Sequence, residues 1–301
     1  MTKLKGRYQA SPPLLKVAQW LGSAFILTII ALLCWNRLPD KQSTTALKLL
    51  QTLQTLSLFM LPPLMMAYIW SRTPAQWLHL TTRPTLMQTA MSVLIMLIAI
   101  PGINLLAHWN SLIILPDFLR PIEAVLQQLE EQAAALTLRF MQTTSATGLI
   151  SNILVMALLP AISEELTFRG LMLNLFAGKA QHSAGSQRTP HAAIWAVAFI
   201  FALVHMQFYG FIPRMLIGAL LGYMLYSTGS LWIPVIMHFT NNAAAVLAYF
   251  VVFKTGLNPD NVDTIGTGTT LWLGLISIIA TLTLVIFHFK RQQQGNINNA
   301  F

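Results

Sequence analysis

Long apolar runs alternate with short polar connections along most of the chain, and this pattern predicts membrane-spanning helices. A run of about 17–30 residues forms a helix long enough to cross a hydrocarbon core of about 30 Å. We therefore expect an all-α, polytopic transmembrane bundle of about eight spans, with a kink at Pro62-Pro63 in the second span. The expected helices cover approximately residues 17–35, 46–70, 85–108, 148–177, 191–208, 213–227, 231–253 and 270–289.

The composition also indicates a membrane protein. Hydrophobic residues make up 55% of the chain and charged residues only 9%, whereas a soluble domain carries about 25% charged residues. The single cysteine, Cys34, excludes an internal disulfide and a cysteine-ligated metal site. The basic amino terminus precedes an apolar run from Val17 to Trp35 without a small-residue cleavage site, so we interpret this run as an uncleaved first span.

The distribution of Lys and Arg predicts the orientation in the membrane. With the amino terminus inside, the inner connections hold basic residues and no acid, so both termini are expected in the cytoplasm. The net charge of +9 therefore reflects topology and does not indicate nucleic-acid binding. In a bacterium the protein would be a multi-pass protein of the cytoplasmic (inner) membrane. The inner basic residues are Lys3, Lys5, Arg7, Lys16, Arg72, Arg83, Lys179, Arg188, Lys290 and Arg291.

The longest connection, about residues 109–147, lies outside in this topology. Its stretch from Glu123 to Met141 has helical spacing of apolar residues and predicts an amphipathic helix on the outer surface, or else a solvated connector helix. We divide the chain into a three-span region with this external helix (1–147), a central region (148–253) that carries the polar residues discussed next, and a last span with a cytoplasmic tail (254–301).

Two adjacent acids, Glu164 and Glu165, lie inside the fourth expected span. A carboxylate in hydrocarbon costs about 2.5 kcal/mol or more, so an intramembrane acid indicates a functional site. Glu165 and Arg169 are four residues apart on one helical face and can neutralise each other. Glu164 is then the unpaired acid, and desolvation suits such a carboxyl group to general base catalysis near neutral pH.

Two histidines lie inside later spans. Phe201 and His205 are one turn apart in the fifth span, and His238 and Asn242 are four apart in the seventh. A neutral imidazole and a carboxamide on one helical face can both donate hydrogen bonds to an oxyanion. Asn241 is a weaker candidate for the same role.

The three motifs, Glu-Glu-x-x-x-Arg, Phe-x-x-x-His and His-x-x-x-Asn, occur in this order on separate spans. In this respect residues 148–253 resemble the CPBP intramembrane proteases, a family that includes the type II CAAX prenyl endopeptidases and bacteriocin-processing proteins. The resemblance implies that Glu164 and His205 activate water and that His238 and Asn242 hold the oxyanion. Glu165 and Arg169 would be supporting residues.

The resemblance leaves the cofactor undetermined. Glu164, His205 and His238 form a candidate zinc set, but no His-Glu-x-x-His motif is present. We favour metal-independent chemistry and keep zinc as the alternative. The implied partners are the lipid bilayer and a peptide or protein substrate that enters from the membrane, of CAAX or bacteriocin-leader type.

Two other classes of protein fit the same residues. A proton-coupled transporter could use the Glu/His set as a proton relay, although the repeats typical of transporters are not evident. A catalytically silent scaffold or immunity protein would tolerate Glu164→Gln. A purely structural alternative is a salt-bridge network, in which Arg169 would have to neutralise both glutamates.

Overall fold

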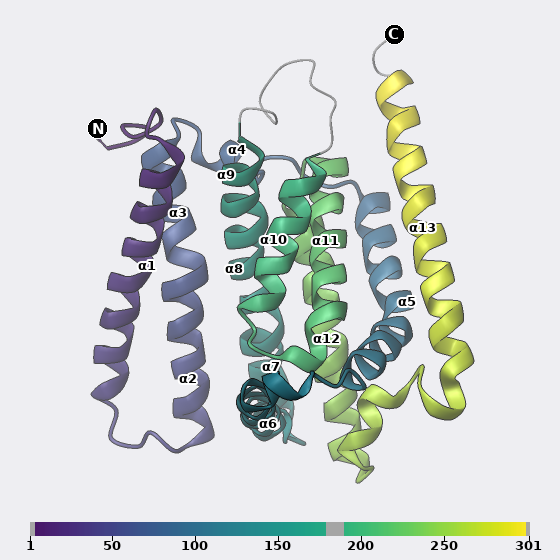
Figure 1. Cartoon of the computed structure of the whole chain (residues 1–301). Coiled ribbons are helices and arrows are strands. Elements are labelled where there is room, and N and C mark those ends of the chain that lie inside the picture. Colours follow the sequence, from purple (N-terminus) through teal and green to yellow (C-terminus); the bar gives the residue numbers. More distant parts are fainter. Residues whose placement is uncertain (1–3, 179–189, 299–301) are drawn as a thin grey trace.

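The computed structural model describes residues 4–178 and 190–298, with side chains described up to Arg291. Within these residues every regular element is a helix, and the long helices other than α6 form a single bundle with roughly parallel axes (Figure 1). The α-helices are α1 (Pro13–Asn36), α2 (Thr44–Thr55), α3 (Leu61–Trp70), α4 (Pro74–Trp77), α5 (Leu86–Ser111), α6 (Arg120–Met141), α7 (Ala146–Asn152), α8 (Leu159–Glu165), α9 (Leu173–Ala177), α10 (His191–Leu203), α11 (Phe211–Thr228), α12 (Trp232–Thr255) and α13 (Leu271–Asn298).

Several of these helices are joined end to end by π-helical segments. The segments η1 (Leu56–Met60), η3 (Ile153–Leu158) and η4 (Leu166–Met172) connect them into two long helices, Thr44–Trp70 and Ala146–Ala177. The short 3₁₀ turns are η2 (Asp117–Leu119), η6 (Phe208–Gly210), η7 (Pro259–Thr264) and η8 (Gly268–Thr270).

Seven helices of the described chain are long and apolar enough to cross a membrane. They correspond to seven of the eight expected spans, and the all-α transmembrane fold is confirmed. The fifth expected span, 191–208, differs because α10 has only 13 residues. It ends at Leu203, and Met206 in the following turn has a φ of 53°, a left-handed conformation that no α-helix can continue through.

Proline accounts for two of the π-helical segments. A proline within a helix has no N–H to donate and its ring crowds the preceding turn. A wider π turn is one way in which a helix absorbs such a defect. The segment η1 ends just before Pro62-Pro63, where the kink is expected, and η3 ends just before Pro160. The segment η4 follows Glu165 directly and lies at the site described below.

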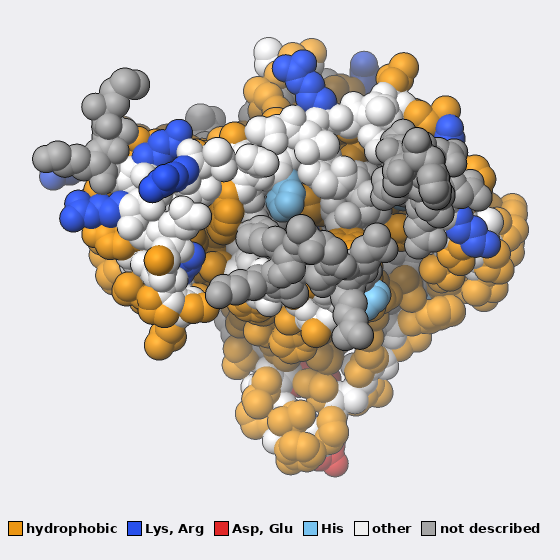
Figure 2. Space-filling view, turned by 90° about the horizontal axis from the view of Figure 1, so that it is seen from above, with side chains coloured by type: hydrophobic (Ala, Val, Ile, Leu, Met, Phe, Trp, Pro, Cys, Tyr) orange, Lys and Arg blue, Asp and Glu red, His pale blue; other side chains and the backbone are white. Residues whose placement is uncertain are grey.

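The two ends of the bundle differ in charge. α1 begins and α13 ends at the same end of the bundle (Figure 1), as an even number of crossings requires. Figure 2 shows this face, on which Lys and Arg are scattered and Asp or Glu is visible only at the margin of the view. The loop acids belong to connections at the opposite end. Of the inner basic residues, Lys3, Lys179 and Arg188 lie outside the described residues, and the cytoplasmic assignment of this end stays a prediction.

The buried core lies in the middle of the bundle. Buried apolar residues of α3, η4, α10 and α11 pack around the helix that carries the two glutamates, with Leu171 and Ala198 fully buried. The edge helices α1 and α13 instead expose large apolar side chains, such as Phe25 (67% exposed) and Ile279 (65%). A bundle that is apolar on its outside is suited to lipid rather than to water.

Helix α6 runs across the acid-bearing end of the bundle, nearly perpendicular to the other helices (Figure 1). It contacts the turn between α10 and α11, where the Glu130 carboxylate accepts a hydrogen bond from the Tyr209 backbone N–H (3.1 Å). The expected apolar stripe consists of the residues with helical spacing, Val125, Leu129, Ala133 and Leu136, and of these Val125 and Leu136 are exposed at 55% and 41%. The stripe is therefore not buried against the protein along its whole length.

Candidate active site

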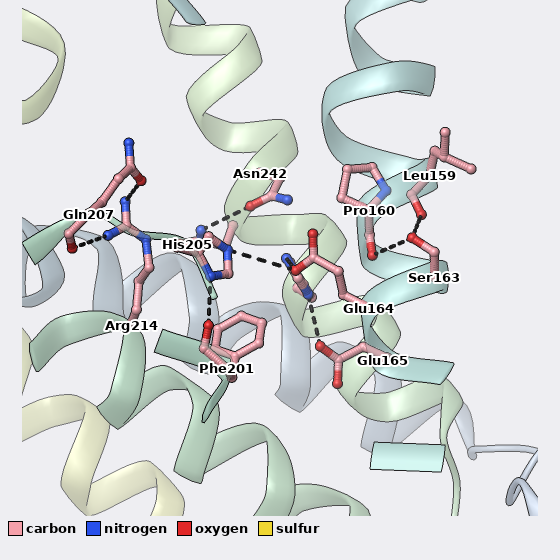
Figure 3. A network of polar contacts seen from close by, with 12 residues as sticks. Leu159, Pro160, Ser163, Glu164, Glu165, Phe201, His205, Gln207, Arg214 and Asn242 are labelled. Carbon is pink, nitrogen blue, oxygen red and sulfur yellow. Dashed lines mark hydrogen bonds and ion pairs between the residues drawn. The ribbon is translucent and has the colours of Figure 1, made fainter. Parts of the chain in front are cut away.

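The two adjacent glutamates point in different directions from the end of α8. Successive residues of a helix are about 100° apart, and this rotation turns Glu165 into the protein and Glu164 toward the histidines (Figure 3). The Glu165 side chain has no exposed surface, whereas 16% of the Glu164 side chain is exposed. One acid is therefore a buried structural charge, and the other borders a space that solvent reaches.

Glu165 and Arg169 form a buried network that links three helices. Its Oε1 accepts a hydrogen bond from Arg169 Nη1 (2.8 Å) and another from His238 Nδ1 on α12 (2.8 Å). Arg169, which is also fully buried, donates through Nη2 to the Gly218 carbonyl of α11 (2.9 Å). Buried charges are tolerated when they are paired and hydrogen-bonded, and this network holds α8, α11 and α12 in fixed relative positions.

The hydrogen bond to Glu165 determines what His238 presents to the site. A carboxylate paired with arginine accepts hydrogen bonds, so the proton of this contact lies on His238 Nδ1. His238 Nε2 then carries a proton only when the ring is an imidazolium. The expectation that a neutral imidazole donates to an oxyanion is therefore not what this geometry favours, because a neutral ring with Nδ1–H offers only a lone pair at Nε2.

His205 is held in the same way by a different acceptor. Its Nδ1 lies 2.7 Å from the Phe201 carbonyl oxygen, one turn earlier in α10, so Nδ1 must be the donor. In the neutral ring, Nε2 then has a free lone pair. His205, which is expected within the fifth span, lies instead in the turn after α10. Its ring is still beside that of Phe201, with centroids 4.9 Å apart.

Both Nε2 atoms face the same oxygen of Glu164. Glu164 Oε2 lies 3.9 Å from His205 Nε2 and 4.0 Å from His238 Nε2. It is buried and has no hydrogen-bond partner among the described residues. These separations are too long for direct hydrogen bonds, but a single water molecule with hydrogen bonds of about 2.8 Å would bridge them. The structure thus brings together one acid from α8, one histidine from the turn after α10 and one histidine from α12.

Asn242 lies one helical turn beyond His238 on α12, near His205 and Glu164 in Figure 3. Its Oδ1 is 3.3 Å from Asn241 Nδ2 and accepts that hydrogen bond. With its oxygen engaged, the Asn242 carboxamide has its NH₂ group available as a donor. Asn241 therefore orients the Asn242 side chain, because its hydrogen bond fixes Oδ1 of Asn242 as the acceptor.

Aromatic rings form the buried side of the site. The Phe201 ring packs edge to face against Phe168 (centroids 5.1 Å apart) and against His238 (6.1 Å). The Arg169 guanidinium lies 4.7 Å from the centroid of the same ring, within the range of a cation–π interaction. Phe201 therefore lies in contact with Arg169 and with both histidines, and it fills the buried side of the site.

The candidate zinc set can be compared with the geometry that zinc requires. Zinc ligands lie about 2.0–2.2 Å from the metal, so two donors of a tetrahedral site are about 3.3 Å apart. The Glu164–His205 and Glu164–His238 separations exceed this, and no group of three His, Cys, Asp or Glu in the described chain is arranged to hold a metal ion. The side chains would have to approach one another to ligate zinc.

The expected residues are thus placed as follows. Glu164, His205 and His238 converge, Asn242 lies beside them, and the expected Glu165–Arg169 ion pair is present. Sequence reasoning missed the Glu165–His238 hydrogen bond, because spacing along one helix gives no information about contacts between helices. It also assigned no role to Arg214, whose charge lies close enough to influence His205 and Glu164.

The fold and this site define a multi-pass membrane protein with a Glu/His cluster inside the bundle. Comparison with known protein families adds that residues 146–244 match the family model described as type II CAAX prenyl endopeptidase Rce1-like. The predicted resemblance is confirmed over this segment, which contains Glu164, His205, His238 and Asn242. Neither the curated proteins nor the solved structures include a significant match to the chain.

Proposed function

We propose that the protein is an intramembrane endopeptidase that hydrolyses a peptide bond with water activated by Glu164. The observation that supports this most directly is the position of Glu164 Oε2, buried without a hydrogen-bond partner among the described residues and facing two imidazole Nε2 atoms. An unpaired intramembrane carboxylate is costly to maintain, and a catalytic base explains that cost. The match to an endopeptidase family supports the same reaction class.

In the attack step, Glu164 takes a proton from water while the water oxygen bonds to the carbonyl carbon of the scissile peptide. His205 Nε2 accepts a hydrogen bond from the second O–H group of the water. This hydrogen bond orients the lone pair of the water oxygen toward the substrate carbonyl. The Phe201 carbonyl holds the ring through Nδ1, so His205 does not have to reorient during the reaction. Such fixed orientation is a large part of the advantage of an enzyme over solution.

The negative charge that develops on the carbonyl oxygen requires donors. We assign His238 Nε2–H, in the imidazolium form, and the Asn242 NH₂ group to this role. Glu165 stabilises the imidazolium through the 2.8 Å contact at Nδ1. Because the surroundings are largely apolar and buried, each donor is worth more than it would be in bulk water.

Breakdown of the tetrahedral intermediate returns the proton from Glu164 to the leaving nitrogen, and the carbon–nitrogen bond breaks. The products are one peptide with a new carboxylic acid and one with a new amine, and Glu164 is again ionised. The acid then gives the second proton of the water to the amine, which leaves a carboxylate and an ammonium group. We propose that the substrate is a membrane-associated peptide or protein segment. CAAX-type tails and bacteriocin-like leaders are the two classes to be compared.

The test is proteolysis in detergent or liposomes with a quenched-peptide library. Wild type is compared with Glu164→Gln, which keeps the shape of the side chain and removes the base. Glu131→Gln, at an exposed position on α6, is the matched control for loss of one acid. Wild type and the Glu131 variant should cleave, whereas Glu164→Gln should lose at least about 100-fold in kcat, as expected for a general base.

Equal cleavage by Glu164→Gln would contradict the assignment of Glu164 as the base. Failure of wild type to cleave any peptide, together with Glu164-dependent proton uptake, would favour a transporter instead. Each reaction is repeated with a strong chelator. Unchanged rates would support the metal-independent mechanism, and a loss that added zinc reverses would show that Glu164, His205 and His238 rearrange around a metal.

A further inference from the structure

A second charged group borders the site and has no part in the mechanism above. Arg214 is in the first turn of α11, nine residues after His205, and it is only partly accessible to solvent. In Figure 3, Arg214 and Gln207 lie on one side of His205, and Glu164 lies on the other. The two ends of the site therefore carry opposite charges.

The hydrogen-bond partners of Arg214 are neutral. Its guanidinium donates through Nη1 to the Gln207 backbone carbonyl (3.2 Å) and through Nη2 to the Gln207 side-chain oxygen. No carboxylate of the described residues lies within 4.0 Å of its nitrogen atoms. Arginine has five N–H donors in a fixed fork, and Gln207 uses two of them, which leaves three for another acceptor.

The guanidinium is held in place by the backbone of the turn. A Cβ atom added at Gly210 would lie 2.9 Å from Arg214 Cζ and 3.1 Å from Nη2, so the guanidinium packs directly against the Gly210 backbone. Gln207 holds the same group from a second direction. A binding group that is already ordered loses little entropy when a ligand arrives.

The nearest acids do not neutralise Arg214 directly. Glu130 and Glu164 both interact with it electrostatically, but neither approaches to ion-pair distance. Glu130 is engaged with the Tyr209 backbone N–H, and Glu164 faces the histidines. A partly buried cation with only neutral contacts favours an anionic ligand, and a carboxylate matches the arginine fork in a bidentate manner.

We propose that Arg214 is the subsite for a carboxylate of the substrate peptide, which fixes the peptide relative to the scissile bond. This inference rests on the proposed function. The carboxylate is either the free carboxyl terminus or an Asp or Glu side chain, since both offer the same two oxygen atoms. Arg214 would then be a specificity-determining residue, and it would select peptides that carry a negative charge at a set distance from the cleaved bond.

The test uses one cleaved peptide from the library in three forms that differ only at the carboxyl end. The first has a free carboxylate, the second a carboxamide, and the third a carboxamide with a terminal Glu in place of the last residue. The ratio of kcat/KM for the acid to that for the amide is measured in wild type, Arg214→Gln and Arg214→Lys. Arg139→Gln, on the exposed side of α6, removes one positive charge at the same end as a control.

We expect wild type and Arg139→Gln to prefer a carboxylate form at least tenfold, mainly through a lower KM. Arg214→Gln should bring the ratio close to one, and Arg214→Lys should give an intermediate ratio because a point charge replaces the fork. If wild type prefers only the peptide with the free carboxyl terminus over the carboxamide, the ligand of Arg214 is the terminal carboxylate. If it prefers the peptide with a terminal Glu and a carboxamide to the same degree, Arg214 accepts any carboxylate near this position.

A wild-type ratio near one, or a ratio that Arg214→Gln leaves unchanged, would overturn the subsite while the protease assignment stands. If Arg214 only braced the turn, its substitution would slow acid and amide peptides equally and leave the ratio intact. If wild type cleaves no peptide of the library from which the test peptide is chosen, the proposed function itself is contradicted, and the subsite with it.

Discussion

Glu164 and Glu165 are neighbours in sequence with opposite electrostatic surroundings, so the same substitution should have opposite effects on stability. Glu165→Gln leaves Arg169 as an unpaired buried cation, a change that typically costs about 3–5 kcal/mol. Glu164→Gln removes a carboxylate whose Oε2 atom has no hydrogen-bond partner among the described residues. We expect thermal unfolding in detergent to show a lower Tm for Glu165→Gln and an equal or higher Tm for Glu164→Gln. Equal losses for both would contradict the division of roles.

The two ring nitrogens of His238 can be separated by substitution. In His238→Asn the amide lies where Nδ1 lay and can still donate to Glu165, but nothing replaces Nε2. In His238→Gln the amide reaches toward the Nε2 position and abandons Glu165. We expect His238→Asn to keep its Tm and lose about 100-fold or more in kcat, the cost of one oxyanion donor.

His238→Gln should show the reverse pattern, with a lower Tm and more residual activity than His238→Asn. Both variants are measured side by side for Tm and kcat on the same peptide. If the Tm of His238→Asn is as low as that of Glu165→Gln, the asparagine amide does not replace the hydrogen bond from Nδ1 to Glu165. The assignment of separate roles to the two ring nitrogens would then fail.

At the scale of elements, the close packing of α10 against α11 positions His205. A Cβ atom added at Gly218 of α11 would lie 3.2 Å from Ala198 Cα and 3.2 Å from the Phe201 ring. Small residues at such crossings let helix backbones approach in membranes. We expect Gly218→Leu to push the helices apart, displace Phe201 and with it the His205 ring, and lower kcat at least tenfold together with Tm.

The matched control is Gly22→Leu in α1, where an added Cβ meets nothing within 4 Å. This substitution should leave both Tm and kcat unchanged, because the new side chain points away from every neighbour in the described chain. If both leucine variants lost Tm and kcat to a similar extent, the loss would come from placing leucine in any membrane helix. It would then not be specific to the α10–α11 crossing.

At the scale of the whole molecule, the charge asymmetry predicts which end faces the cytoplasm. In a Cys34→Ser background, Gln128→Cys probes the acid-bearing end and Thr81→Cys probes the other, both at exposed positions. In intact cells of a bacterial host, a membrane-impermeant maleimide should label the cysteine at 128. The cysteine at 81 should react only after permeabilisation, and the reverse pattern would invert the topology.

Most of the bundle could be predicted from the sequence because membrane spans and intrahelical pairs are local properties. Apolar run length predicted the long helices, and a spacing of four predicted the Glu165–Arg169 pair. The length of α10 could not be predicted from the apolar run, because the run continues beyond Leu203, where the helix ends. The turn that follows contains Met206, whose backbone has a positive φ. The Glu165–His238 bond and the position of Arg214 depend on how helices pack, which no periodicity along a single helix encodes.

The shared oxygen of Glu165 also has a consequence during biogenesis. His238 is oriented only once α12 has docked against α8, and Arg169 is satisfied only once α11 has joined them. Helices that have just been inserted therefore carry the residues of the proposed site before these residues are aligned. Under the proposed function, hydrolytic activity would therefore appear only after α8, α11 and α12 have docked, and a partly assembled bundle would not cleave the proteins around it.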